Sequence, residues 1–257
     1  MGLESLLMTR RGFSLVELLV SIAIIAVLLA MLLPTLVHAR RLSHQVNCAN
    51  NLRQVSIGWV TYIQENKDTF PRFGVFPDWN YGGASFLGPE RTPILASERP
   101  INRYIADDDT GAAMSRNLIA LFRCPSDRGV YERGATVRGV SPRSLLEEGR
   151  SCFENFGTSY RANPFLLDST RAGIDELQRP LRLYEIHVDQ SRLLLMGDPA
   201  WWFATRPPTD PESLREASWH GTIDGGNMLA VDGSTRFIKF GERGAPSFVL
   251  MPRPYTR

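Results

Sequence analysis

The sequence has little net charge of either sign and few motifs of catalytic centres. Its 29 basic and 27 acidic residues leave a formal charge of +2. A protein that binds nucleic acid through phosphate contacts needs a strong basic excess, so no nucleic-acid partner is expected. The chain also lacks the Gly-x-Ser-x-Gly, His-Glu-x-x-His and phosphate-loop motifs. These absences predict a protein that is not an enzyme and has no cofactor.

Cysteine is scarce as well, with Cys48, Cys124 and Cys152 as the three examples. No two of them have the close spacing of a zinc motif, so zinc is not expected. Outside the cytoplasm a disulfide can form, and an odd number leaves one thiol free or joined between chains. We favour Cys48 with Cys124, because one lies on an expected long helix and the other in the globular part. The alternatives are Cys124 with Cys152, or three free thiols.

The chain does have one long apolar segment near its N-terminus. Of the 21 residues from 13 to 33, 18 are apolar, and the exceptions are Ser14, Glu17 and Ser21. As a helix this segment is about 31 Å long, which matches a hydrocarbon core of roughly 30 Å. A carboxylate inside such a segment is unfavourable, so Glu17 points to a function and to a partner.

Three interpretations of this N-terminus are compatible with its composition. The first is a plain membrane anchor that tolerates one glutamate. The second is a secretory signal peptide with Arg10 and Arg11 at its basic end and cleavage at residues 37–39, although its apolar run exceeds the usual ~7–15 residues. Residues 9–15 also have a short similarity to a twin-arginine export signal. The third interpretation, which we favour, also accounts for the order of residues 11–19.

Residues 11–19, Arg-Gly-Phe-Ser-Leu-Val-Glu-Leu-Leu, resemble the class III signal of type IV pilins and type II secretion pseudopilins. The resemblance implies that a prepilin peptidase cuts between Gly12 and Phe13 and methylates the new Phe13 amine. It also implies that Glu17 serves assembly by pairing with the Phe13 amine of a neighbouring subunit. The helix dipole favours a carboxylate in the first turn, and a buried charge is strongly disfavoured unless it is paired.

The same resemblance implies where the protein acts. We expect a single-pass protein of the cytoplasmic (inner) membrane, with a cytoplasmic N-terminus and a C-terminal domain that is periplasmic or on a cell-surface filament. The expected partners are identical or homologous pilin subunits, prepilin peptidase, a secretion or pilus assembly platform, and membrane lipid. The chain would join a type II secretion or type IV pilus-like filament, or stay in the membrane as a subunit. The alternative is a membrane-anchored carbohydrate-binding protein or metal-dependent enzyme delivered by the same leader.

The chain divides into four expected segments. These are a leader at 1–12, a transmembrane and assembly helix at 13–33, its amphipathic continuation at 34–66, and an extracytoplasmic globular domain at 67–257. Pro34 is expected to bend or open the helix locally. After it, apolar residues recur at steps of three and four, which predicts one helix face packed on the domain. The residues of this face are Ala39, Leu42, Val46, Ala49, Leu52, Val55, Trp59, Val60 and Ile63.

Three apolar runs late in the chain predict strands, at residues 192–196, 227–231 and 234–240. The Asp-Gly pair at 232–233 predicts a tight hairpin between the last two. Residues 67–110 are rich in glycine and proline and predict a long irregular excursion with one short strand. Short helices are expected after residues 107–109 and from Ser141 and Asp210. We therefore predict an α+β, pilin-like fold, in which the long helix packs on an antiparallel β-sheet with long loop insertions.

Further motifs occur in order at residues 48–54, 122–127, 159–163, 219–221 and 231–233. Together they resemble the large pilin-like proteins, abundant in planctomycetes and their relatives, that carry a C-terminal histidine and Asp-Gly signature. The chain departs from that family where small residues follow its Asp-Gly pair in place of an aromatic or histidine-containing hairpin. The resemblance therefore implies the architecture of the protein more than its biological function.

Four residues near predicted strand ends or loops are weak metal candidates, namely Asp198, His220, Asp224 and Asp232. Some pseudopilins bind calcium through loop carboxylates, so the resemblance implies calcium as the ion, and residues 107–109 are a further acidic candidate. We favour structural roles for all of them: a strand end, a hydrogen bond, a hairpin turn and a helix cap. The aromatic run at 201–203 is expected in the core, with an exposed carbohydrate- or protein-binding surface as its alternative.

Overall fold

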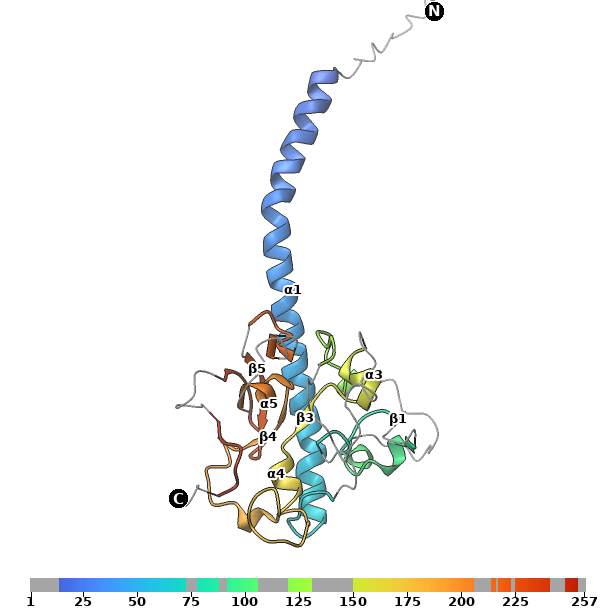
Figure 1. Ribbon diagram of the computed structural model, residues 1–257. Helices are drawn as coiled ribbons and strands as arrows, with labels where there is room; N and C mark the ends of the chain where they lie inside the picture. Colours follow the sequence, from blue (N-terminus) through green and yellow to red (C-terminus); the bar gives the residue numbers. More distant parts are fainter. Residues whose placement is uncertain are drawn as a thin grey trace, which may run out of the picture. The chain divides into compact units, whose positions relative to one another are not determined.

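The computed structural model describes residues 14–72, 78–87, 92–105, 120–130, 150–205, 214–215, 217–222, 225–240 and 248–253. The chain forms two compact units, Met1–Arg41 (unit 1) and Leu42–Arg257 (unit 2). Helix α1 (Leu15–Glu65) has 51 residues and contributes to both units (Figure 1). The helix continues through Pro34, so this proline does not end it.

The part of α1 in unit 1 exposes its apolar side chains. None of the most apolar 18-residue window of the helix is buried inside the protein. By length and composition, this helix is able to cross a membrane, a test that a signal sequence also passes. A membrane anchor is the interpretation that the apolar helix favours.

The part of α1 in unit 2 buries a single face. Cys48, Leu52, Val55, Trp59 and Ile63 are buried, and they follow one another at steps of three or four residues. The face predicted from the sequence was partly wrong, because four of its residues are exposed. These are Ala39 and the larger Leu42, Val46 and Val60, the last three with exposed fractions of 48%, 56% and 39%. Each residue turns the helix by about 100°, so a residue next to Trp59 in sequence points well away from it.

Unit 2 contains an antiparallel sheet of four strands. In spatial order these are β3 (Arg161–Ala162), β4 (Leu194–Gly197), β5 (Gly225–Ala230) and β6 (Thr235–Lys239). The tight turn that joins β5 to β6 is the predicted Asp-Gly hairpin, and β4 overlaps the predicted strand at 192–196. Strand β3 was not predicted. The long helix and the antiparallel sheet confirm the predicted α+β, pilin-like layout.

The sheet is covered on both faces within unit 2. Side chains alternate between the faces along a strand. Leu195 and Leu229 belong to the cluster that contains the buried face of α1. Leu194 and Met228 belong to a second cluster, which includes helix α5 (Ala200–Thr205). This coverage explains why every residue of β4 and β5 is buried.

The described part of unit 2 also contains short elements. They are β1 (Phe86–Leu87), β2 (Pro93–Ile94), the 3-10 helices η2 (Ala96–Glu98), η3 (Asn102–Tyr104) and η5 (Leu183–Glu185), and helices α3 (Cys152–Phe156) and α4 (Pro164–Leu167). Between residues 67 and 110 the prediction of one short strand was incomplete, because β1 and β2 pair as a small antiparallel ladder. Short helices were expected to start near residues 107–109, 141 and 210. These start positions lie outside the described residues.

Candidate functional site

A disulfide joins α1 to a loop of unit 2. Cys48 and Cys124 are 76 residues apart in sequence, and their Cα atoms are 5.2 Å apart. This is the pairing that we favoured from the sequence, and Cys152 is a free, buried cysteine. Burial, assisted by the negative charge of Asp127, raises the pKa of the Cys152 thiol well above its ordinary value. A thiol of that kind is unreactive at neutral pH.

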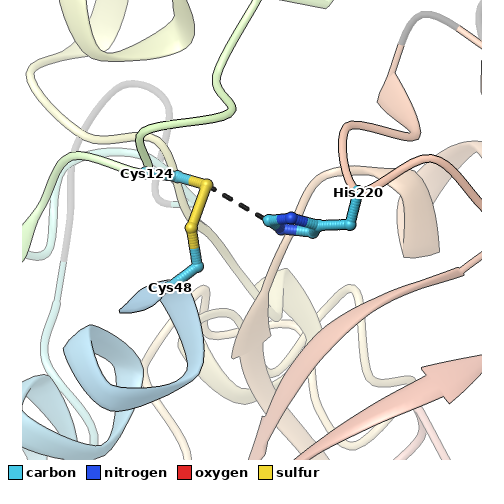
Figure 2. Close-up of side chains that lie close together, drawn as sticks. All are labelled: Cys48, Cys124 and His220. Atoms are coloured by element: carbon cyan, nitrogen blue, oxygen red, sulfur yellow. Dashed lines mark hydrogen bonds between the residues drawn. A yellow bond between two sulfur atoms is a disulfide. The ribbon is translucent and has the colours of Figure 1, made fainter. Parts of the chain in front are cut away.

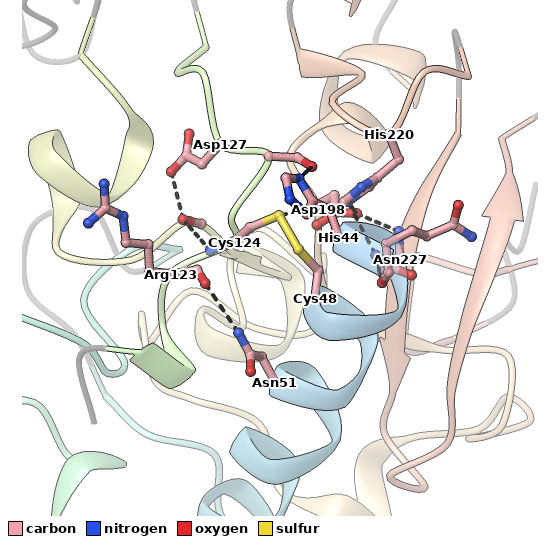
Figure 3. Close-up of a disulfide and its surroundings, with 12 residues drawn as sticks. His44, Cys48, Asn51, Arg123, Cys124, Asp127, Asp198, His220 and Asn227 are labelled. Atoms are coloured by element: carbon pink, nitrogen blue, oxygen red, sulfur yellow. Dashed lines mark hydrogen bonds and ion pairs between the residues drawn. A yellow bond between two sulfur atoms is a disulfide. The ribbon is translucent and has the colours of Figure 1, made fainter. Parts of the chain in front are cut away.

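Hydrogen bonds hold the loop around the disulfide (Figure 3). Asn51, one turn along α1 from Cys48, donates to the carbonyl of Arg123 at 3.1 Å. The backbone N–H of Cys124 donates to Ser159 Oγ at 3.0 Å, and Ser159 Oγ donates to Asp127 Oδ2 at 2.6 Å. The disulfide is therefore fixed between the helix and a hydrogen-bonded loop.

Asp127 caps helix α3. Its carboxylate accepts the backbone N–H groups of Gly129, Cys152 and Phe153, each at 2.9 Å. The last two belong to the first turn of α3, whose amides have no partner within the helix. Burial raises the pKa of Asp127, and the hydrogen bonds that it accepts oppose that rise. These contacts give Asp127 a structural role.

A group of three buried polar residues lies beside the disulfide (Figure 3), and Figure 2 shows one of them, His220, next to the two cysteines. We call Asp198, His220 and Asn227 the polar cluster. His220 Nε2 is 3.1 Å from Asp198 Oδ2, 3.3 Å from Asn227 Nδ2 and 3.8 Å from Cys124 Sγ. Asp198 Oδ2 also accepts the backbone N–H of Asn227 at 2.6 Å. The side chains of His220 and Asp198 are 0% and 1% exposed, so water does not reach them freely.

The sheet brings the polar cluster together. Asp198 directly follows β4, Asn227 lies on β5, and the two strands are antiparallel neighbours. Gly226 leaves room for Asp198, because a Cβ atom at this glycine would stand 3.0 Å from Asp198 Cβ. Asn227 Nδ2 donates to the carbonyl of Gln45 on α1 at 3.3 Å. The cluster thus connects the ends of two strands to the helix that carries Cys48.

Three polar atoms of the cluster lack hydrogen-bond partners among the described residues. They are Asp198 Oδ1, His220 Nδ1 and Asn227 Oδ1, and all three are buried. In the described part of the chain, no arginine or lysine forms an ion pair with Asp198, whose neighbouring titratable side chain is His220. Burial and the negative charge of Asp198 raise the pKa of Tyr160 well above its ordinary value. A buried carboxylate with an imidazole beside it is chemically suited to hold a cation.

The structure brings together two of the four metal candidates named from the sequence. Asp198 and His220 are in contact, whereas Asp224 lies outside the described residues. Asp232 lies in the turn between β5 and β6, where its Oδ1 accepts the N–H of Ser234 at 2.9 Å. The acidic residues 107–109 also lie outside the described residues. Sequence reasoning missed Asn227, because a polar residue inside a strand gives no local sign of a contact.

The aromatic run that follows Asp198 is buried. Trp201, Trp202 and Phe203 belong to the second core cluster, on the face of the sheet with α5. The guanidinium of Arg161 lies 3.7 Å from the centre of the Trp202 ring and pairs with Asp78 at 2.7 Å. The core interpretation is therefore correct, and these rings do not form an exposed stacking surface.

Glu17 lies in the first turn of α1 with its side chain exposed. Its Oε2 accepts the backbone N–H of Ser14 at 2.9 Å, and Ser21 Oγ donates to the Glu17 carbonyl at 2.7 Å. The carboxylate thus satisfies one of the free amides at the helix start. Gly12 and Phe13 lie outside the described residues.

Comparison with known proteins identifies this N-terminal region. Residues 7–33 match the family described as the prokaryotic N-terminal methylation motif. No curated protein and no solved structure matches the chain. The match covers Gly12, Phe13, Glu17 and the apolar run together. With the long apolar helix, it is consistent with a type IV pilin-like protein and confirms the family resemblance of the leader.

Proposed function

We propose that this chain is a pilin-like subunit processed by a prepilin peptidase. The peptidase cuts between Gly12 and Phe13, and the new Phe13 amine is methylated. The match to the methylation motif over residues 7–33 carries this proposal, because it covers the basic leader, the cut and the apolar run in one stretch. The exposed apolar helix that follows supports anchoring in the cytoplasmic membrane.

Assembly through the N-terminal helix is the second part of the proposal. The subunit joins a type II secretion or type IV pilus-like filament, or stays in the membrane next to the assembly platform. Glu17 is exposed in the first turn of α1, so its carboxylate is free to meet the Phe13 amine of another copy. Such a contact joins different surfaces of identical subunits, and it produces an open polymer when the rotation does not close.

The globular domain is proposed to lie outside the cytoplasm, with the N-terminus inside. The disulfide between Cys48 and Cys124 supports this placement, because disulfides persist mainly in oxidising compartments. Four hydrogen bonds around Asp127 and Ser159 hold the loop that carries Cys124 in a geometry suited to the bridge.

The domain is proposed to act by association rather than by catalysis. His220 and Asp198 are buried, so a substrate does not reach them in this conformation. The alternative of a carbohydrate-binding protein loses its main support, because Trp201 and Trp202 are part of the core. No nucleic-acid partner is proposed for a chain with a formal charge of +2.

Mass spectrometry of the mature N-terminus tests the proposal. The full chain is produced together with a prepilin peptidase, purified in detergent and digested. We expect an N-terminal peptide that begins at Phe13 with one added methyl group. A Gly12→Leu variant should remain uncut, whereas Gly2→Leu, a matched change within the leader, should be cut normally. Recovery of an intact leader, or of a chain that begins at Arg40, would overturn the proposal.

A further inference from the structure

The disulfide and the polar cluster together hold a set of atoms with the chemistry of a metal site. Cys48 Sγ, Cys124 Sγ and a ring nitrogen of His220 lie within 4.8 Å of one another, and all three residues are buried (Figure 2). We propose that reduction of the Cys48–Cys124 disulfide converts this region into a zinc site with Cys48, Cys124, His220 and Asp198 as ligands. The site exists in the reduced protein, and the disulfide replaces it in the oxidised one.

Two of the present distances are close to those between ligand atoms of a tetrahedral zinc site, and Asp198 has to move toward the sulfurs to complete it. With Zn–S near 2.3 Å and Zn–N or Zn–O near 2.0 Å, neighbouring ligand atoms are about 3.3–3.8 Å apart. Cys124 Sγ is 3.8 Å from His220 Nε2, and Asp198 Oδ2 is 3.1 Å from the same nitrogen. The two sulfurs of a disulfide are about 2.05 Å apart, so they need to separate by about 1.7 Å. Rotation about the Cα–Cβ bonds of Cys48 and Cys124 accommodates that movement. Cys48 lies on α1, and Cys124 lies on a loop.

The unsatisfied carboxylate oxygen of Asp198 is a second, independent sign of a ligand. Asp198 Oδ1 is buried without a hydrogen-bond partner among the described residues. Native proteins contain few such atoms, and a bound ion is one way in which they are satisfied. The backbone N–H of Asn227 holds Asp198 Oδ2 at 2.6 Å, which fixes the carboxylate, while Oδ2 keeps a further lone pair for a cation and Oδ1 accepts no hydrogen bond. Hydrogen bonds of this kind orient the ligands of metal sites.

A dithiol is the reductant in the proposed reduction of the disulfide. The dithiol supplies two electrons and two protons, the bond between Cys48 and Cys124 breaks, and the reductant becomes a disulfide. Zinc then displaces the two thiol protons, which leave to water, because thiolates are the metal ligands. Two thiolates, an imidazole and a carboxylate form a ligand set that suits zinc, whereas calcium and magnesium prefer oxygen ligands only.

No local sequence pattern marks this site, because its two cysteines are 76 residues apart. The usual zinc signature has two ligands a few residues apart on one turn. Here the fold supplies the proximity: α1 brings Cys48, the loop after residue 120 brings Cys124, the end of β4 brings Asp198, and the segment before β5 brings His220.

Metal binding by the reduced full-length chain in detergent tests the proposal. The chain is kept under a phosphine reductant, which is oxidised to a phosphine oxide and adds no competing thiol. A thiol count distinguishes three free cysteines from the single one of the oxidised protein. We expect one equivalent of Zn²⁺ per reduced chain, release of about two protons per zinc, and a higher unfolding temperature with zinc. Co²⁺ in place of zinc should give a thiolate-to-cobalt charge-transfer band in the near ultraviolet.

Variants separate this site from adventitious binding. His220→Asn and Asp198→Asn should weaken zinc binding by more than the roughly 10–100-fold typical of changes next to a metal ligand. Cys152→Ser and His44→Asn change a buried thiol and a nearby histidine outside the site, and they should bind zinc as the native chain does.

Several results would overturn the proposal. One is a reduced chain that retains its circular dichroism spectrum but takes up no stoichiometric zinc. Another is equal binding by the oxidised chain, or by His220→Asn. If reduction alone unfolds the chain, added zinc should restore a cooperative unfolding transition, and a failure to restore it also contradicts the proposal.

Discussion

Asn51 donates its side-chain amide to the carbonyl of Arg123 at 3.1 Å, one residue before the cysteine that is bonded to Cys48. The same amide also donates to the carbonyl of Ala120 at 3.1 Å. The loop that carries Cys124 is thus tied to α1 by two hydrogen bonds and a covalent bond within a few residues. Contacts this close together share the same loop, so their contributions to stability should depend on each other.

Removal of the disulfide should destabilise unit 2 substantially. The bridge closes a loop of 76 residues, and loss of such a bridge typically lowers the free energy of unfolding by roughly 2–5 kcal/mol. Urea unfolding of the full chain in detergent should show this loss for the Cys48→Ser, Cys124→Ser double variant. Cys152→Ser controls for the exchange of a buried thiol for a hydroxyl. Equal stabilities of the double variant and this control would contradict the prediction.

Asn51→Ala tests whether the hydrogen bonds and the disulfide act together. With the bridge present, loss of the two hydrogen bonds should lower the free energy of unfolding by roughly 1–3 kcal/mol. Without the bridge the loop is less well placed, and the same change should have a smaller effect. A double-mutant cycle from urea unfolding should give a coupling energy of at least about 0.5 kcal/mol. Strict additivity would mean that the loop keeps its position without the disulfide.

Gly58 should be difficult to replace although it lies inside a helix. A Cβ atom there would stand 2.5 Å from Ile105 Cγ1 and 2.7 Å from Ile101 Cγ2. Alanine normally stabilises a helix by about 1 kcal/mol relative to glycine, but overpacking of a core has a cost of about 1–3 kcal/mol. We expect Gly58→Ala to lower the free energy of unfolding, and Ile105→Ala to relieve part of that loss in the double variant. An increase in stability for Gly58→Ala alone would show that η3 moves away freely.

Stability should fall in acid partly through Glu185. Hydrogen bonds from the Arg179 guanidinium, at 2.8 and 2.6 Å, lower the pKa of the Glu185 carboxyl below its ordinary value. Because the folded pKa is below the unfolded one, this stabilisation is present above about pH 4.5 and disappears as the pH falls through the folded pKa. Glu185→Gln removes it, so the variant should differ most from the native chain near neutral pH and least in strong acid. Urea midpoints measured across this range test the trend, with the exposed Glu176→Gln as the matched control.

The hairpin of β5 and β6 shows what local signals are able to predict. Asp232 accepts the N–H and hydroxyl of Ser234, and Gly233 has a φ of 85°, which favours glycine. The turn needs only these three neighbouring residues, so its formation could be predicted from the sequence alone. The apolar helix and its acidic residue are local patterns of the same kind, and they too were found from the sequence.

The candidate site depends instead on contacts between distant residues. Asn227 reaches the carbonyl of Gln45, 182 residues away, and His220 meets Cys124 across 96 residues. Strand β3 has two residues, too few for an alternation of side chains, and it is defined by its pairing with β4. On α1, the periodic pattern offered Val46 and Val60 as core residues, but the position of the sheet decides which face is buried. Periodicity identifies a helix more reliably than it identifies its buried side.

Glu17 provides the most direct test of assembly. In the isolated subunit its carboxylate is exposed and caps the helix start by accepting the Ser14 N–H. In a filament, removal of the charge would leave the Phe13 amine of a neighbour buried without a partner, which is unfavourable by about 3–5 kcal/mol. Glu17→Ala should therefore be processed normally and yet fail to enter filaments. Sheared filaments and membranes are separated, and the share of processed chain in each is measured.

Glu17→Gln separates the charge from the cap. A glutamine oxygen still accepts the Ser14 N–H, so the helix start is preserved while the charge is lost. If assembly needs the ion pair, Glu17→Gln should fail as completely as Glu17→Ala, and the shorter Glu17→Asp should retain part of the native level. Ser21→Ala removes a polar group from the same apolar run and should assemble like the native chain. Normal assembly of Glu17→Gln would show that the carboxylate acts only within its own helix, and the proposed contact between subunits would then be wrong.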